Sequence, residues 1–83
     1  MNANEIKYIL VDMLQTVFLH KVNKDVLEYI DFIDDLGMDS ITFISVVVEI
    51  ENAFGITVPD NAMSMDNFRN IDAIIRIIED SKV

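Results

Sequence analysis

The residues of this sequence that could take part in chemistry are Asp39 and Ser40, which lie where a loop passes into a segment with helical spacing. A serine hydroxyl at the start of a helix is expected to be exposed. An anion attached to it would meet free backbone N–H groups and the positive end of the helix dipole, so the position suits a phosphodiester. The simpler interpretation is that Asp39 or Ser40 is only the N-cap of the helix.

A nucleophilic role for Ser40 in hydrolysis would need a base, and the chain offers a single imidazole, His20. This histidine follows the first predicted helix, about twenty residues before the serine. Nothing around Ser40 resembles a nucleophile elbow. We expect His20 to be a surface or helix-end residue, and we predict no catalytic residue.

The acidic residues before Gly37 do not form a calcium loop. If Asp31 were the first ligand, the third position would be the apolar Ile33. Leu36 occupies the place that needs glycine, and Thr42 stands where the bidentate glutamate should be. The chain has no cysteine for a thiolate site either. We therefore predict no metal site and expect these acids to be surface charge.

The 83 residues fit a single domain, 1–83, with a small core. Fifteen acidic residues against six Lys and Arg give a net charge of −9, which would repel nucleic-acid phosphates and anionic lipids. We expect no nucleic-acid or membrane partner. The opening Met-Asn-Ala-Asn-Glu lacks the basic start of a signal peptide, so we expect a cytoplasmic protein.

The spacing of the apolar residues predicts an all-α fold. Two glycines and one proline interrupt the chain, and all three fall between runs of helical spacing. Apolar residues recur every three or four positions over residues 6–17, which predicts the first helix. Residues 19–38 keep no single period and predict a long ordered loop, with room for a short helical turn.

Three further segments complete the predicted order of elements. The second helix is expected over residues 41–54, because Asp39-Ser40 favours a helix start and Gly55 a helix end. Residues 60–68 are expected to hold a short third helix. Asn70 can cap a last helix that has an isoleucine face and Lys82 near its negative end.

The second predicted helix is apolar on two sides. Its heavier stripe, expected to face the core, consists of Phe43, Val46, Val47, Ile50 and Phe54. Its lighter stripe, nearly opposite, consists of Ile41, Ile44 and Val48. A domain this small seldom covers both stripes, so the lighter one is expected to be a docking surface. The alternative is that the 19–38 loop folds over it.

The expected core draws on every predicted helix and on the segments between them. Its members are Ile6, Leu10, Met13, Leu14, Val17, Phe32, Leu36, Val46, Val47, Ile50, Phe54, Ile56, Val58, Phe68, Ile71, Ile74, Ile75 and Ile78.

Three adjoining motifs resemble the carrier-protein family, that is, the acyl carrier proteins and the related peptidyl carriers. The resemblance covers nearly the whole chain, although the Asp-Ser-Ile tripeptide is weak by itself. The motifs are Asp31-Phe32-Ile33-Asp34-Asp35, Leu36-Gly37-Met38-Asp39-Ser40-Ile41 and Glu51-Asn52-Ala53-Phe54-Gly55-Ile56-Thr57-Val58-Pro59-Asp60.

This resemblance implies a four-helix bundle with a long loop between its first two helices and a short third helix. It implies that Ser40 receives 4′-phosphopantetheine, derived from coenzyme A, from a phosphopantetheinyl transferase. The thiol of that arm would carry an acyl, aminoacyl or peptidyl group as a thioester. The protein itself would perform no catalysis, and we expect it to be a monomer.

The resemblance also implies where partners bind. Loading enzymes and downstream synthase or transferase enzymes are expected to contact the second helix, its start and the loop before it. Carried over to this sequence, the contact residues are Asp35, Met38, Asp39, Ile41, Ile44, Val48 and Glu51.

The sequence departs from the fatty-acid type of carrier. Thr42 and Ser45 stand at positions that are usually acidic, and Asn52 and Ala53 stand where further acids are common. We therefore expect a specialised pathway, such as polyketide or nonribosomal peptide synthesis or amino-acid activation. The alternatives are a housekeeping role in fatty-acid synthesis and, less favoured, a carrier-like interaction module that is never modified.

Overall fold

A computed structural model describes residues 2–19 and 22–81, so His20 and Lys82 lie outside the described residues. The elements in chain order are α1 (Ala3–Val17), α2 (Lys24–Leu27), α3 (Ser40–Phe54), η1 (Asp60–Ala62), η2 (Met65–Phe68) and α4 (Ile71–Ser81). The described residues contain no strand, and the predicted all-α fold is confirmed. No helix in this part of the chain is long and apolar enough to cross a membrane.

Side chains and glycine set the ends of the two long helices. Asn2 and Glu5 form a capping box at the start of α1, in which Asn2 Oδ1 accepts a 2.9 Å hydrogen bond from the Glu5 N–H. Asp39 is the N-cap of α3, and its Oδ1 accepts a 2.8 Å hydrogen bond from the Thr42 N–H. The helix α3 ends at Gly55, whose φ of 64° is favourable for glycine.

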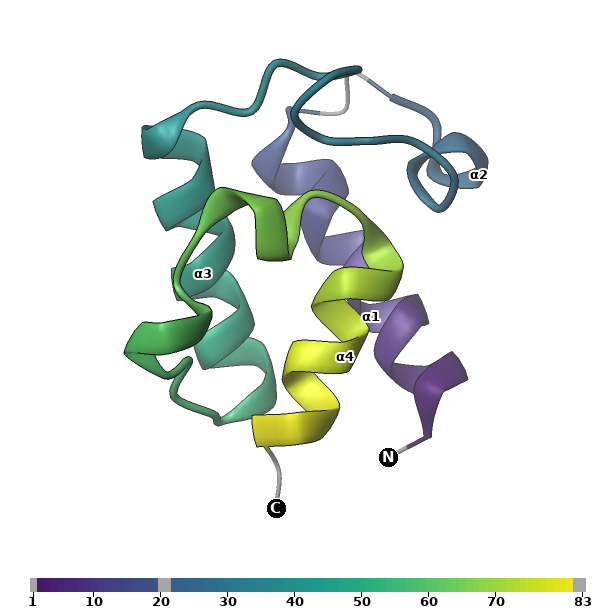
Figure 1. The fold of residues 1–83 in the computed structure, drawn as a ribbon. Helices are drawn as coiled ribbons and strands as arrows, with labels where there is room; N and C mark the ends of the chain where they lie inside the picture. The colour runs from purple at the N-terminus through teal and green to yellow at the C-terminus, as the bar shows by residue number, and fades with distance from the viewer. Residues whose placement is uncertain (1, 20–21, 82–83) are drawn as a thin grey trace.

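Three longer helices, α1, α3 and α4, surround the core, and the 3₁₀ helices η1 and η2 close the side between α3 and α4 (Figure 1). The short helix α2 packs against α1. The core is apolar, and Phe32 and Phe68 are fully buried in it. Phe18 packs on Phe32 with ring centroids 5.3 Å apart, and Phe43 packs on Phe68 at 5.4 Å.

The predicted core is largely the observed one. Met13, Val17, Leu36 and Ile56 are only partly buried, and they pack at the edge of the core. Phe18, Leu27 and Met38 are also buried, although we did not predict them as core residues. Leu27 and Met38 lie in the 19–38 segment, which has no helical periodicity, and Phe18 lies just before it. Their burial follows from how the loop folds, which the spacing of apolar residues does not reveal.

Both connecting segments contain short helices, as predicted, but the second is divided into two. The 19–38 segment contains α2, which corresponds to the short helical turn allowed for it. The short third helix expected over 60–68 consists of two separate 3₁₀ helices, η1 and η2. Neither has a side-chain cap, and each is only three or four residues long, which is the usual length of this tighter helix.

A single arginine joins these two segments. Arg69, directly after η2, donates from Nε to Asp31 Oδ2 at 2.5 Å and also pairs with Asp34 and Asp66. The backbone N–H of Phe32 donates to the Arg69 carbonyl at 2.6 Å. The loop before α3 is therefore tied to η2 through both the backbone and side chains.

Candidate functional site

Ser40 is the first residue of α3, at the end of the helix that meets the long loop (Figure 1). The residue is exposed, and no hydrogen bond within the described residues engages its hydroxyl. Asp39 provides the cap, so the N-cap interpretation is confirmed for Asp39 and leaves the Ser40 hydroxyl without a structural task. An exposed hydroxyl at a fixed position is accessible to a modifying enzyme.

The charge next to Ser40 belongs to Asp39. Hydrogen bonds from the backbone N–H and the side chain of Thr42 hold the pKa of the Asp39 carboxyl below its ordinary value of 3.8. This carboxylate already satisfies one of the amides that could have met an anion attached to Ser40.

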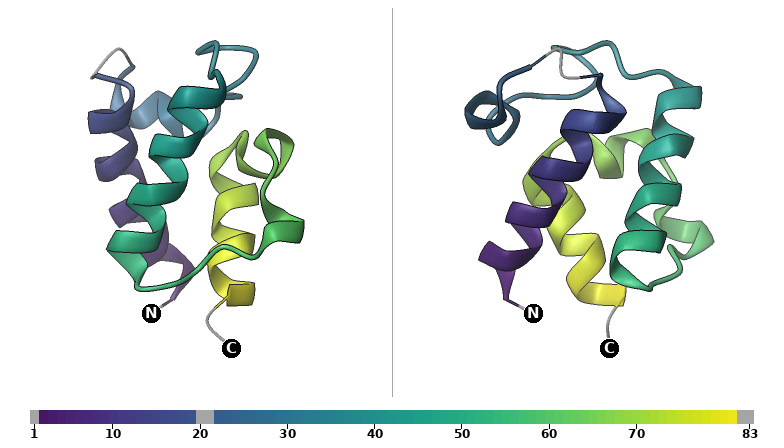
Figure 2. Two further views of the ribbon diagram at one scale, coloured as in Figure 1. Left: turned by 90° about the vertical axis from the view of Figure 1, so that its left-hand side faces the viewer. Right: turned by 180° about the vertical axis from the view of Figure 1, so that it is seen from behind.

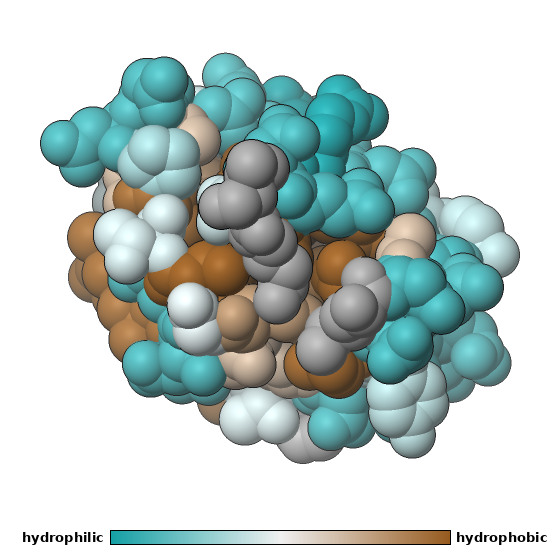
Figure 3. Space-filling model, turned by 90° about the horizontal axis from the view of Figure 1, so that it is seen from below, coloured by the Kyte–Doolittle hydropathy of each residue, from teal (hydrophilic) through white to brown (hydrophobic). Residues whose placement is uncertain are grey.

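The lighter stripe lies on the open side of α3. Ile41, Ile44 and Val48 are 79%, 60% and 47% exposed, respectively, so the loop does not cover them. The heavier stripe is buried throughout, as the sequence predicted. Figure 3 shows the end of the molecule that carries both termini, where hydrophobic surface reaches the edge on the α3 side.

The structure distributes the predicted partner residues unevenly. Asp39 is exposed together with the lighter stripe. Asp35 is exposed, but its Oδ2 accepts a 2.8 Å hydrogen bond from the Asp31 N–H. Glu51 is partly buried, and its Oε2 accepts a 2.8 Å hydrogen bond from the Val58 N–H. The carboxylates of Asp35 and Glu51 thus hold the protein's own backbone.

Met38 departs from the expected partner surface. Its side chain is only 4% exposed and belongs to the core. The reason is local, because its backbone N–H donates to the Phe32 carbonyl at 2.9 Å and turns the loop inward just before Asp39. In this conformation the Met38 side chain is not on the surface where we expected it.

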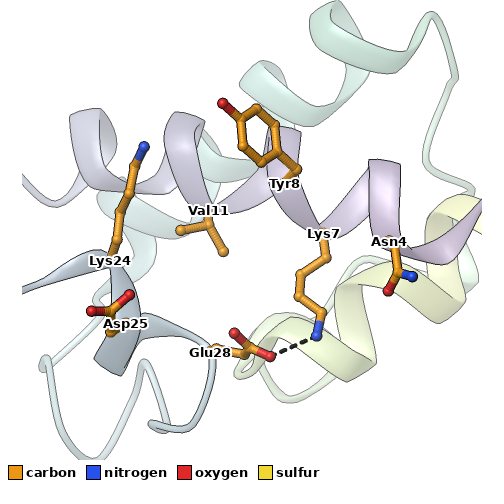
Figure 4. Close-up of a pocket in the computed structure, with 7 residues that line it drawn as sticks. All are labelled: Asn4, Lys7, Tyr8, Val11, Lys24, Asp25 and Glu28. Atoms are coloured by element: carbon orange, nitrogen blue, oxygen red, sulfur yellow. Dashed lines mark hydrogen bonds and ion pairs between the residues drawn. The ribbon is translucent and has the colours of Figure 1, made fainter.

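A pocket of about 270 Å³ between α1 and α2 is a separate feature of the surface (Figure 4). Both of its lysines are paired: Lys7 Nζ lies 2.6 Å from Glu28 Oε1, and Lys24 Nζ lies 3.3 Å from Asp12 Oδ1, which is not part of the pocket lining. None of its lining residues is on α3. The described residues also hold no group of acids and histidines suited to a metal ion.

An α-helical bundle with a free serine at the start of one helix, beside an exposed apolar stripe, has the features of a carrier domain. Residues 10–78 match the model of the family described as "Phosphopantetheine attachment site". The chain belongs to this family.

Similar proteins that share one name support membership of this family. The acyl carrier protein of Helicobacter pylori (strain ATCC 700392 / 26695) is 27% identical over 77 residues, which cover 89% of this chain and 96% of the relative. The acyl carrier protein of Helicobacter acinonychis (strain Sheeba) is 29% identical over the same shares. That of Chloroherpeton thalassium (strain ATCC 35110 / GB-78) is 44% identical over 52 residues, 61% of this chain and 62% of the relative.

Membership of the family establishes the general role. The protein is an acyl carrier, and its prosthetic group is covalently bound 4′-phosphopantetheine. Members of this family are generally not enzymes themselves and interact with phosphopantetheinyl transferases and synthase enzymes. The hydroxyl at the start of α3 fits such a group, because Ser40 is exposed and its hydroxyl makes no hydrogen bond within the described residues.

Proposed function

We propose that Ser40 is the attachment residue for 4′-phosphopantetheine and that the carried acyl group is held on the arm as a thioester. The observation that carries this proposal is the free, exposed hydroxyl at the first residue of α3. When bound, the group supplies the thiol that a chain without cysteine lacks. The protein performs no catalysis of its own in this proposal.

The residues around Ser40 position the attachment point. Asp39 caps α3 and Arg69 ties the preceding loop to η2, so the serine sits on a restrained junction. The lighter stripe, directly after Ser40, offers apolar contacts to the enzymes that load or process the arm. The net charge of −9 favours partners with basic surfaces and steers their approach.

The proposed pathway is a specialised one, such as polyketide or nonribosomal peptide synthesis or amino-acid activation. Thr42 and Ser45 make the acidic face of α3 thin, and the Glu51 carboxylate is engaged by Val58. The similar proteins are named acyl carrier proteins, which keeps the housekeeping role in fatty-acid synthesis as the alternative. We further propose a cytoplasmic monomer that forms one domain over residues 1–83.

Intact-mass measurement tests the attachment. The purified, unmodified protein and Ser40→Ala are incubated with coenzyme A and a broad-specificity phosphopantetheinyl transferase. The wild type should gain the mass of one phosphopantetheinyl group, and Ser40→Ala, which should stay folded, should gain none. A folded wild type that gains no mass would instead support the unmodified interaction module.

A loading screen tests the pathway. The modified protein is offered malonyl transferases of fatty-acid synthesis, polyketide acyltransferases, and adenylating enzymes for amino and aryl acids. Loading by an adenylating enzyme or by a polyketide acyltransferase is the expected result. Efficient malonyl loading and chain elongation by a fatty-acid synthase, with no adenylating enzyme active, would contradict the specialised role.

A further inference from the structure

A groove of about 450 Å³ lies between α1 and α3, next to the lighter stripe. Met13, Thr16 and Val17 line it from α1, and Ser45 and Glu49 line it from α3. The two helices run side by side (Figure 2, left panel). Met13 and Val17 are partly buried, whereas the other three residues are exposed, so the groove has an apolar floor and a polar rim.

Glu49 contributes the one charge on this rim. Within the part of the chain that the structure describes, its carboxylate takes part in no hydrogen bond or ion pair, unlike that of Glu51 on the same helix. The cations that the structure pairs with acids lie elsewhere, namely Lys7, Lys24 and Arg69. The Glu49 carboxylate is therefore available to a cation from another molecule.

The hydroxyl of Ser45 adds a second acceptor. Its Oγ donates to the Ile41 carbonyl at 3.3 Å, which uses its proton and leaves lone pairs on the oxygen. A guanidinium group carries only donors, in a planar fork that matches a carboxylate, and its aliphatic stem packs on apolar surface. The groove fits both parts of an arginine side chain. Its N–H donors can bind Glu49 and Ser45, and its stem can pack against Met13 and Val17.

The groove is continuous with the lighter stripe. Ile41, Ser45 and Glu49 follow one another at intervals of four residues and so form one row along α3. A protein that lies on Ile41, Ile44 and Val48 thus reaches the groove without leaving this surface. The charge of the chain, −9, also favours a basic residue at the edge of the contact.

We propose that this groove receives an arginine side chain of the enzymes that bind the lighter stripe, and that Glu49 is the specificity residue for that contact. The inference rests on the proposed function, because it concerns the enzymes that act on the arm. The acidic contact on α3 is then Glu49. The carboxylate of Glu51, which the family resemblance assigned to partner contact, is occupied by the Val58 N–H.

Transfer kinetics with the broad-specificity phosphopantetheinyl transferase test the proposal, with carrier concentration as the variable. Glu49→Gln is compared with Glu79→Gln, an exposed position on α4 that changes the net charge equally. We expect Glu49→Gln to raise KM about five- to tenfold with kcat unchanged, since a charge-assisted contact is lost. The control should stay within about twofold of the wild type, and the difference should shrink in high salt.

A second variant separates the groove from the charge. Thr16→Tyr fills the groove from the exposed rim without changing the net charge, and it should raise KM to a similar extent. Melting curves by circular dichroism check that each variant is folded. Wild-type KM in both variants, or an equal rise in Glu79→Gln, would overturn the proposal. A wild type that gains no phosphopantetheine at all would overturn the proposed function as well, which is a distinguishable result.

Discussion

Glu51 Oε2 accepts a hydrogen bond of 2.8 Å from the backbone N–H of Val58, so a side chain of α3 holds the segment that leaves the same helix. Val58 itself is 3% exposed and packs in the core. The bond therefore fixes the turn at Gly55 and the buried extended residue that follows it. A carboxylate that the family resemblance assigned to partner contact has a structural role in this chain.

Removal of this bond is expected to destabilise the protein. Glu51→Ala leaves the partly buried Val58 N–H without its acceptor, which should lower the free energy of unfolding by about 1–2 kcal/mol. Urea denaturation followed by circular dichroism measures the change. Glu49→Ala is the matched control, because Glu49 is exposed on the same helix. Equal stability of the two variants would show that the Glu51 bond contributes nothing.

The contact between Arg69 and Asp31 predicts a dependence of stability on pH. The hydrogen bond from Arg69 is the main reason that the pKa of Asp31 lies below its ordinary value of 3.8. A carboxyl whose pKa is lower in the folded state stabilises the fold above its unfolded pKa, and this contribution disappears as pH falls through the folded pKa. Urea midpoints of the wild type and Asp31→Asn should differ at neutral pH and converge well below pH 3.8. A gap that stays constant over this range would contradict the assignment.

Truncation of a side chain should destabilise the protein on one side of α3 and have almost no effect on the other. Phe54 is 7% exposed on the heavier stripe, and Phe54→Ala should cost about 3–5 kcal/mol of unfolding free energy. Val48 is 47% exposed on the lighter stripe, and Val48→Ala should change that free energy by no more than about 0.5 kcal/mol. Chemical denaturation of both variants checks the orientation of the helix. An unchanged denaturation midpoint for Phe54→Ala would show that we had assigned the wrong side of α3 to the core.

The excess of acidic residues predicts that salt stabilises the fold. A net charge of −9 on 83 residues produces self-repulsion, which counter-ions screen over a distance of about 10 Å at 0.1 M salt. The melting temperature should rise between low and moderate concentrations of sodium chloride. A melting temperature that falls over this range would mean that attractive ion pairs, such as those of Arg69, outweigh the repulsion.

The features that could be predicted from the sequence are those marked by periodic apolar residues or by residues typical of helix ends. Helical spacing and the Asp39 and Gly55 boundaries identified α3, and its two apolar stripes separated the buried side from the exposed one. The burial of Met38 was missed because a loop has no periodicity. The turn that buries this residue includes a backbone hydrogen bond from Met38 to Phe32, which apolar spacing does not indicate.

The groove at Glu49 was missed for a different reason. It lies between two helices that are far apart in the sequence, so Met13 and Glu49 come together only when these helices pack. The 3₁₀ conformation of η1 and η2 was missed as well, because apolar spacing over segments this short does not distinguish one helix type from another.

The ion pairs of Arg69 with Asp31 and Asp34 restrain the loop before α3 and hence the place from which an arm on Ser40 would swing. A tether with a stationary origin sweeps a limited volume around one end of the molecule, and its thiol reaches only active sites brought within that radius. Enzymes that use such an arm would therefore have to come to this end of the molecule, and the thiol could enter only one active site at a time.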